Sequence, residues 1–272
     1  MIEAYDVSVE ISGRRILENV SLAARPGELT AVIGPNGSGK TTLMKALCRD
    51  YAYDGLISVN GRDLQLLRPI EAATLRAVLP QQSALPFPFT VREVVALGLT
   101  AGLSGVPLSA RKRLPEEALA RVDLDGFAGR FYGELSGGEQ QRVQLARVLC
   151  QVWVPVLDGV PRYLLLDEPV SSLDIKHQLM IMDVARDFAN AGGGVIAILH
   201  DLNLAAMYAD AILALRQGRV AGFGAPGEVL TDALLAEVFD CPMQVSRTPA
   251  PGMPFVLPQS AVHRDGLQSK VA

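Results

Sequence analysis

The stretch Ile33-Gly34-Pro35-Asn36-Gly37-Ser38-Gly39-Lys40-Thr41-Thr42 decides the fold of this chain. It follows an apolar run at residues 29–33 and precedes a helix-forming segment at residues 43–47. It matches the pattern G-x-x-x-x-G-K-[ST] in full, in which glycines let consecutive backbone N–H groups point at one phosphate group. The helix that starts there adds its positive dipole end. The stretch therefore predicts a phosphate-binding loop between a strand and a helix of an α/β fold.

The side chains of this loop predict a bound triphosphate with its metal ion. We expect Lys40 to reach the β- and γ-phosphates as a point charge, and the hydroxyl of Thr41 to enter the Mg²⁺ shell, with Thr42 in support. The rest of the phosphate cradle consists of Gly34, Pro35, Asn36, Gly37, Ser38 and Gly39. An ordinary glycine-rich turn between a strand and a helix would need neither the lysine nor the hydroxyl.

The composition is that of a folded protein with no general attraction for nucleic acid. The chain has 272 residues, of which 49% are hydrophobic, and this is enough to bury a large core. A net charge of −4 gives no basic field, so we expect no nucleic-acid partner. Cys48, Cys150 and Cys241 are far apart and in no metal-ligand spacing, which indicates free thiols. The sequence shows no secretory signal and no apolar run of membrane-spanning length. If the protein works at a membrane, we therefore expect another subunit to span it.

Hydrophobic periodicity predicts an α/β core that is interrupted by a helical segment. Residues 2–10 and 20–24 alternate around a turn at Gly13-Arg14-Arg15 and predict an antiparallel sheet. Further strands are predicted at residues 29–33, 55–61, 76–80, 163–167 and 195–199, with a hairpin over residues 211–223. Helices are predicted at residues 91–99, 115–122, 175–190 and 226–239, and from Ser136, where Glu139 gives the spacing of a capping box.

A second group of polar residues stands where two of these strands end. Asp167 and Glu168 come at the end of an apolar strand, where an α/β sheet binds ligands. Asp167 is a candidate Mg²⁺ ligand, and Glu168 is placed to polarise the water that attacks a γ-phosphate. His200 ends the next strand and can hydrogen-bond the γ-phosphate or that water. Taken alone, an acidic pair at a strand end is common on protein surfaces, and a single histidine there is more often structural.

A second anion-binding end is predicted at Ser136-Gly137-Gly138, where a hydroxyl, two glycine N–H groups and a helix N-terminus coincide. One chain then carries two phosphate-binding ends. Both would be used in a head-to-tail homodimer, in which this stretch of one protomer closes over the nucleotide of the other. The alternative is a helix cap with no ligand, which local sequence alone favours.

Together these motifs resemble the ATP-binding-cassette ATPases over residues 1 to about 240. The resemblance is carried by residues 34–42, Gln81, residues 135–142 and 164–169, Ser171-Ser172-Leu173-Asp174 and His200. It implies a P-loop core with a mainly parallel sheet, an antiparallel β subdomain and an inserted helical subdomain. On this basis residues 1–240 form a single cassette, and residues 241–272 form a proline-rich tail. The core comprises residues 1–81 and 163–240, and the helical lobe comprises residues 82–162.

The resemblance also implies a dimer that binds two ATP molecules with Mg²⁺, and a role for each matched residue. Glu168 is then the catalytic base, His200 is the switch histidine, and Gln81 senses Mg²⁺ and a membrane subunit. The contacts to the γ-phosphate of the opposite protomer come from Ser136, Gly137 and Gly138, and Asp174 belongs to a loop between subunits.

The chain departs from the family pattern at the position that contacts adenine. Members of the family usually place an aromatic residue near residues 13–15 to stack on the base. Here Ile11 and Ser12 occupy these positions. We expect Ile11 to make apolar contact with the base without stacking, which predicts weak selectivity for adenine.

Three further stretches narrow the resemblance to one group of importers. Residues 80–98 and 200–205 are similar to the ATPases that import iron chelates, haem and cobalamin, and the additional stretch at residues 151–162 resembles the haem importers within that group. The resemblance implies an energy-coupling ATPase that is peripheral on the cytoplasmic face of the bacterial inner membrane. Its partners would be two transmembrane permease subunits and, indirectly, a periplasmic substrate-binding protein. The apolar segment at residues 84–91 suits docking of a permease helix or packing within the helical lobe.

Three other functions are weighed against this one. The same role in a ferric-siderophore or cobalamin importer would use the same motifs. A soluble cassette protein of translation or DNA repair would usually fuse two cassettes or carry long coiled insertions, and neither is present. A binding-only switch would not need Glu168 and His200.

Overall fold

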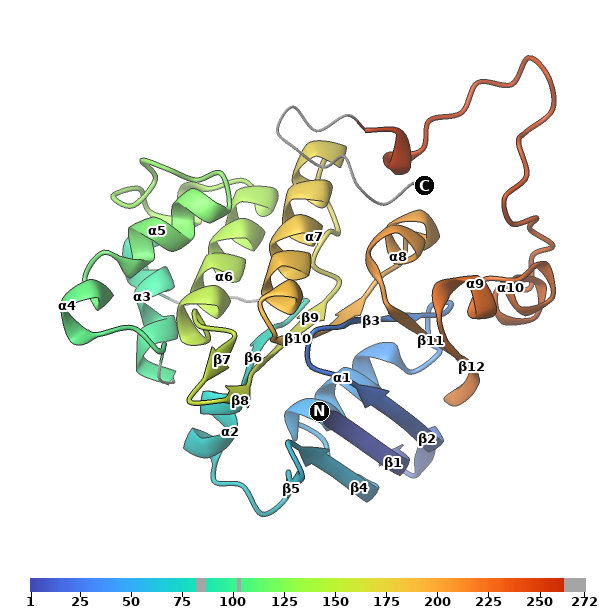
Figure 1. Cartoon of the computed structure of the whole chain (residues 1–272), viewed down its shortest axis with the longest axis horizontal. Coiled ribbons are helices and arrows are strands. Elements are labelled where there is room, and N and C mark those ends of the chain that lie inside the picture. Colours follow the sequence, from blue (N-terminus) through green and yellow to red (C-terminus); the bar gives the residue numbers. More distant parts are fainter. Residues whose placement is uncertain (82–86, 102–103, 262–272) are drawn as a thin grey trace.

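The computed structural model describes residues 1–81, 87–101 and 104–261. The largest sheet has six strands. Figure 1 shows it in the middle, with most of the helices on one face and an antiparallel sheet with helix α1 (Lys40–Cys48) on the other. Two hydrophobic cores lie between these layers, one on each face of the central sheet. The arrangement is a layered α/β fold, as predicted.

The central sheet has the strand order β12-β11-β3-β10-β9-β6. Its strands are β3 (Leu29–Ile33), β6 (Arg76–Leu79), β9 (Tyr163–Asp167), β10 (Gly194–Ile198), β11 (Ala211–Arg216) and β12 (Arg219–Gly224). The neighbours from β11 to β6 pair in parallel, and β12 closes one edge as an antiparallel hairpin with β11. The mainly parallel sheet predicted from the apolar runs is therefore confirmed.

Strand β9 shows why these runs are continuously apolar. Leu164 and Leu166 belong to the core under the helices, whereas Tyr163 and Leu165 belong to the core on the α1 side. Successive side chains of a strand point to opposite faces, and here both faces are covered. The helices over the first face include α3 (Val91–Ala101), α5 (Leu114–Arg121), α6 (Gly137–Gln151), α7 (Ile175–Asn190) and α8 (Leu202–Tyr208).

The antiparallel sheet has the order β2-β1-β4-β5, formed by β1 (Ile2–Ile11), β2 (Arg14–Ala24), β4 (Asp54–Val59) and β5 (Arg62–Asp63). The turn predicted at Gly13-Arg14-Arg15 is one position too late, because Arg14 and Arg15 already belong to β2. The turn is Ser12-Gly13, and both residues have positive φ angles, 51° and 76°. A two-residue turn of this conformation matches the twist of the strands it joins, so the hairpin is as tight as it can be.

Helix α8 and two further short helices were not predicted. Helix α2 (Pro69–Leu75) begins with a proline in its first turn, and the Glu71 carboxylate accepts the backbone N–H of Arg68 at 3.0 Å. Helix α4 (Leu108–Arg111) is a single turn. The 3₁₀ turn η1 (Tyr132–Glu134) then leads into α6. The signal for α2 was present in the sequence, since proline at the first helical position and an early glutamate are typical of helix starts.

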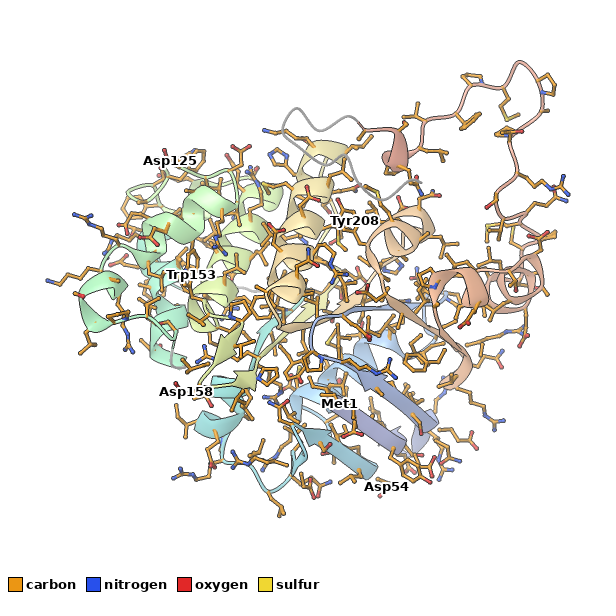
Figure 2. The ribbon with its side chains drawn as sticks, viewed as in Figure 1. Met1, Asp54, Asp125, Trp153, Asp158 and Tyr208 are labelled. Atoms are coloured by element: carbon orange, nitrogen blue, oxygen red, sulfur yellow. The ribbon has the colours of Figure 1, made fainter. Side chains whose placement is uncertain are left out.

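The additional stretch at residues 151–162 contains a small hairpin of β7 (Val156–Leu157) and β8 (Val160–Pro161). Trp153, labelled in Figure 2 together with Asp158, is partly buried against the core beneath the helices. The guanidinium of Arg121 lies over its ring, 4.1 Å from the centroid. The stretch is therefore packed onto the body of the protein.

The C-terminal part differs in one respect from the prediction. The single helix expected at residues 226–239 is two helices, α9 (Pro226–Val229) and α10 (Asp232–Phe239). The hydroxyl of Thr231 caps α10 by accepting the N–H of Leu234 at 3.2 Å, and this start of a new helix interrupts the first.

Beyond α10 the described chain is extended, as predicted, and carries one short 3₁₀ turn, η2 (Pro258–Ser260). This turn lies against α8, where the side chain of Gln259 donates to the carbonyl of Asn203 at 3.4 Å. The three cysteines are free. Over the described residues, every helix is too short or too polar to span a bilayer.

Candidate active site

The predicted phosphate loop connects β3 to α1, and its backbone is one that only glycine can adopt at two positions. Gly34 and Gly39 have φ angles of 148° and 103°. A Cβ atom at residue 34 would collide with the carbonyl oxygen of Leu215, and one at residue 39 would overlap the side chain of Leu17. The loop is thus wedged against β11 and β2, which fixes the direction of its N–H groups.

Lys40 opens α1 and turns back over the loop. Its Nζ atom donates to the carbonyls of Gly34 at 2.8 Å and Pro35 at 3.0 Å. The residue is only 5% exposed, and burial lowers the pKa of its ammonium group, although Glu168 and Asp167 oppose this shift. An ammonium group has three donor hydrogens, so two hold the loop closed and one remains for a phosphate oxygen.

A cavity of about 420 Å³ lies over the loop. It is lined by Arg14, Ile16, Asn36, Gly37, Gly39, Lys40, Thr41, Thr42, Gln81 and Glu168. The structure therefore brings the phosphate loop together with two of the predicted catalytic residues. The other loop residues support this arrangement: Ser38 is buried, and its carbonyl accepts the N–H of Gly218 at 3.0 Å.

Ile11, which was expected to contact the base, is not among the residues that line this cavity. Ile11 packs against the core on the α1 side, and the cavity wall is formed by Arg14 and Ile16 instead. These two residues share one face of β2 because side chains two apart in a strand point the same way. The shift follows from the turn at Ser12-Gly13, which makes Arg14 the first residue of the strand.

Glu168, Gln81 and His200 meet at one edge of the central sheet. Oε1 of Glu168 lies 2.7 Å from Nε2 of His200, and Oε2 accepts the Gln81 side-chain amide at 2.8 Å. These residues follow β9, β6 and β10, which are neighbours in the sheet, so all three leave the sheet at its carboxyl edge. The sequence predicted this convergence.

Glu168 has an unusual backbone conformation, with a φ angle of 54°. A non-glycine residue pays about 1–2 kcal/mol for this left-handed region. The carbonyl of Glu168 accepts hydrogen bonds from the N–H and hydroxyl of Ser171, at 3.3 Å and 3.0 Å, and from the Gln141 side chain at 3.0 Å. These donors offset the cost and fix the direction of the carboxylate.

Asp167 fits the metal role predicted for it. The residue is 5% exposed and its Oδ1 atom has no hydrogen-bond partner among the described residues. Burial, helped by the charge of Glu168, raises its pKa to about 6. A buried carboxylate oxygen without a donor suits a hard cation such as Mg²⁺.

The metal site would not be complete from protein groups alone. The described residues contain no cluster of three or more acidic, histidine or cysteine side chains that could hold a metal. This agrees with the way Mg²⁺ binds, through one or two protein ligands plus phosphate oxygens and water. Asp167, the hydroxyl of Thr41 and the amide of Gln81 are the protein groups available.

Ser136 caps helix α6 as predicted. Its hydroxyl accepts the N–H of Glu139 at 3.3 Å, and the Glu139 carboxylate accepts the N–H and the hydroxyl of Ser136 at 2.8 Å and 2.7 Å. Ser136, Gly137 and Gly138 line a separate cavity of about 430 Å³ that shares no lining residue with the cavity over the phosphate loop. A third cavity, of about 640 Å³, has Gly137 in its lining together with Gln81 and Glu168, but no residue of the phosphate loop.

The phosphate loop, the buried lysine and the carboxylate at the sheet edge define a P-loop nucleotide-binding cassette, and the chain belongs to the ABC transporter family. The model of that family matches residues 17–171. The hemin import ATP-binding protein HmuV of Mesorhizobium japonicum is 66% identical over 97% of this chain and 100% of its own length. The proteins of the same name from Chelativorans sp. and Rhizobium meliloti are 60% and 58% identical, over 96% of this chain and 100% and 99% of their own lengths.

Solved structures agree on the fold. The ATP-binding subunit of an ABC transporter superposes with a TM-score of 0.76 at 24% identity, over 88% of this chain and 98% of that one. A bacterial Atm1-family ABC exporter with ATP bound gives a TM-score of 0.72 at 28% identity, over 88% of this chain and 41% of the exporter. The predicted ATP-binding-cassette fold is confirmed.

Proposed function

We propose that this chain is the ATP-hydrolysing, energy-coupling subunit of a bacterial haem importer. The observation that carries the proposal is the 66% identity, over nearly the whole of both chains, to a protein named for hemin import. The site supports the ATPase part independently, because it combines a phosphate cradle with a carboxylate that is held at the sheet edge. Nothing in the site is built to contact haem, so the cargo is assigned from the relatives.

The substrate ATP would lie along the phosphate loop. Backbone N–H groups of residues 36–39 and the ammonium of Lys40 would bind the phosphates, and Thr41 with Asp167 would hold Mg²⁺. When bound, Mg²⁺ neutralises charge that develops on the β- and γ-phosphate oxygens. Thr42 supports Thr41 from the next position in α1.

Hydrolysis would proceed by attack of one water molecule on the γ-phosphorus. Glu168 accepts a proton from this water as the bond from phosphorus to the ADP oxygen breaks, and ADP leaves. The contact of His200 with one carboxylate oxygen and of Gln81 with the other sets the orientation of Glu168. Gln81 lines the cavity over the phosphate loop, where it would also sense the metal and a permease subunit.

A homodimer would complete the site. Ser136, Gly137 and Gly138 form an anion-binding helix start that the phosphate loop of the same chain does not reach. In a head-to-tail pair this start would face the γ-phosphate held by the other protomer, so ATP binding closes the dimer and hydrolysis reopens it.

This scheme gives each segment of the chain a role. We assign residues 1–81 and 163–240 to the nucleotide-binding core, residues 82–162 to a helical lobe, and residues 241–272 to a tail. The partners of the ATPase would be two transmembrane permease subunits. Of the segment expected to dock a permease, residues 84–86 lie outside the described residues. Phe87 is 67% exposed, which favours docking of a permease helix. Phe89 packs against the core, which favours packing within the helical lobe. The assembly would place the chain on the cytoplasmic face of the inner membrane.

The test is a pull-down of the tagged full chain from its native membranes, followed by ATPase assays with haem-loaded and siderophore-loaded binding proteins. We expect a permease to co-purify and the haem-loaded protein to stimulate hydrolysis, and Lys40→Ala to abolish it. Stimulation by a siderophore or cobalamin system alone would overturn the cargo assignment. Recovery of no membrane protein would favour a soluble cassette ATPase instead.

A further inference from the structure

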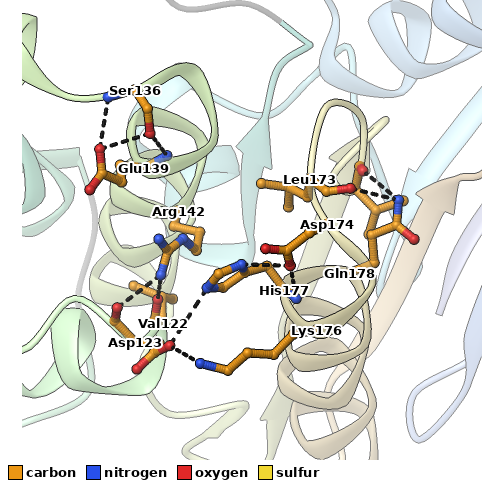
Figure 3. Close-up of polar contacts among 11 residues, drawn as sticks. Val122, Asp123, Ser136, Glu139, Arg142, Leu173, Asp174, Lys176, His177 and Gln178 are labelled. Carbon is orange, nitrogen blue, oxygen red and sulfur yellow. Dashed lines mark hydrogen bonds and ion pairs between the residues drawn. The ribbon is translucent and has the colours of Figure 1, made fainter. Parts of the chain in front are cut away.

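The loop that follows Glu168 faces the start of α6 across a narrow cavity, shown in Figure 3. One wall comes from α6 and the residues before it, and the other from the loop and the first turn of α7. The lining residues are Ser136, Gly137, Gly138, Glu139, Arg142, Ser172, Leu173, Asp174 and His177. A Cβ atom added to Gly138 would come within 2.9 Å of the Leu173 side chain, so the two walls touch at that point.

His177 holds the end of this loop. The Asp174 carboxylate caps α7 by accepting the backbone N–H of His177 at 2.9 Å, and the same oxygen lies 2.8 Å from Nδ1 of the imidazole. Hydrogen bonding to these groups, the backbone N–H first, keeps the pKa of Asp174 below its usual value. Because the carboxylate is ionised and can only accept, Nδ1 must carry the hydrogen in this contact.

The other side of the same ring faces the helical segment. Nε2 of His177 lies 3.6 Å from Oδ2 of Asp123, which also pairs with Nζ of Lys176 at 2.6 Å. Asp123 is itself fixed from α6, because Arg142 donates to its carbonyl at 2.8 Å and to the carbonyl of Val122 at 3.0 Å. The imidazole, 19% exposed, therefore connects the loop on one side to α6 on the other.

Charged groups surround the ring. Asp174 and Asp123 face its two nitrogens, Lys176 and Arg142 stand beyond Asp123, and Glu139 on the far wall is engaged by Ser136 and Arg130. The imidazole thus stands between two carboxylates, one on the loop and one beside α6.

From this geometry we infer that His177 is a positioning residue for the reaction. It sets the distance between the Ser172–Asp174 loop and the helix start at Ser136-Gly137-Gly138, both of which must be in place when a second protomer docks. The inference rests on the proposed function, since it concerns assembly of the ATP-bound dimer. The phosphate loop lies in a different cavity, so ATP binding by one protomer does not depend on His177.

The experiment compares His177→Asn with Lys176→Ala in the full chain. Asparagine keeps a donor for Asp174 but does not reach Asp123, whereas Lys176→Ala removes an exposed ion pair to the same Asp123. We expect His177→Asn to lower kcat and ATP-driven dimerisation about tenfold, with ATP affinity and Tm within the range of Lys176→Ala, which stays within about twofold of wild type. Asp123→Asn should give the same loss, and the double variant no further loss.

A second measurement separates positioning from general packing. In the Glu168→Gln background, ATP-driven dimerisation should be about tenfold weaker with His177→Asn than with Lys176→Ala, while ATP affinity is the same in both. Dimerisation and turnover of His177→Asn equal to wild type would overturn the inference while leaving the proposed function intact. A wild-type chain that neither dimerises with ATP nor hydrolyses it would overturn the proposed function as well, so the two failures are distinguishable.

Discussion

Nε2 of His200 lies 2.7 Å from Oε1 of Glu168, although the two residues are far apart in sequence. The register of the sheet produces this contact, because Ile198 on β10 pairs with Asp167 on β9 and both strands end at that point. Gln81, which follows the other neighbour of β9, donates to the second carboxylate oxygen. One carboxylate thus contacts residues from both flanking strands, and each of its oxygens keeps a lone pair for a water molecule.

Glu168→Gln should abolish turnover while leaving nucleotide binding intact. The amide keeps the shape of the side chain but cannot accept a proton, and loss of a general base costs about 10²–10⁴ in rate. We expect kcat to fall at least 100-fold, affinity for an ATP analogue to stay within about twofold, and an ATP-bound dimer to accumulate in gel filtration. Glu117→Gln, an exposed change on α5, is the control. A variant that keeps a tenth of wild-type turnover would exclude Glu168 as the base.

Asp167→Asn should make the nucleotide-free protein more stable and inactive. The pKa of Asp167 is raised to about 6 from 3.8, so its folded form holds a proton that the unfolded form releases. Stability from this group is therefore present below about pH 4 and is lost as pH rises to 6. At pH 7.5 the neutral amide should raise the free energy of unfolding by up to about 3 kcal/mol.

The measurement is urea unfolding of both proteins at pH 4 and pH 7.5, without ATP or Mg²⁺. We expect the stabilisation only at the higher pH, together with loss of ATPase activity because a metal ligand is gone. A variant that is less stable than wild type at pH 7.5 would contradict the interpretation that the buried Asp167 carboxylate is unfavourable until a cation binds.

Arg14→Ala should weaken ATP binding, and Arg15→Ala should not. Both side chains are exposed, but only Arg14 lines the cavity over the phosphate loop, because the two residues point to opposite faces of β2. A guanidinium can lie against the face of a purine ring. We expect Arg14→Ala to raise the Kd for ATP about threefold to tenfold in a titration with a fluorescent analogue.

Selectivity for the base gives a second readout. Stacking on a guanidinium tolerates any purine, so wild-type affinities for ATP and GTP should lie within about threefold of each other. Equal effects of Arg14→Ala and Arg15→Ala on the Kd would show that the contribution is only one of general positive charge.

The residues of the site could be predicted because their signals are local. Glu168 and His200 each follow an apolar run. Because neighbouring parallel strands end at the same edge of a sheet, the sequence predicts that the two residues lie close together, although it gives no distance. The phosphate loop is likewise read from consecutive residues. The wall of the cavity was not predicted in this way: Ile11 was proposed from the family resemblance, whereas Arg14 and Ile16 line the cavity.

Other features have a weak local pattern or none. Helix α2 has a proline and a glutamate at its start, but Ala72 is its only buried residue, so it lacks the apolar face by which a helix is recognised. The apolar pattern continues over residues 226–239. Thr231 caps α10 and so divides this segment into two helices, but a single threonine is not a distinctive signal for a new helix. The link from His177 to Asp123 joins the first turn of α7 to the turn that follows α5, and only the packing of α6 against its neighbours brings the two residues together.

Gly98→Ala should destabilise the protein although alanine is the better helix former. Gly98 is buried in α3, and an added Cβ would collide with the backbone carbonyl of Arg147 and lie 3.1 Å from Cβ of Cys150 on α6. The gain in helix propensity is about 1 kcal/mol, whereas overpacking against backbone that cannot rotate away costs about 1–3 kcal/mol or more. We expect a net loss of about 1–2 kcal/mol in urea unfolding. Gly133→Ala is the matched control, because nothing lies within 4 Å of its added Cβ, and it should stay within about 0.5 kcal/mol of wild type. A Gly98→Ala protein as stable as wild type would mean that α3 and α6 can separate at no cost, contrary to the close packing that holds the helices over the sheet.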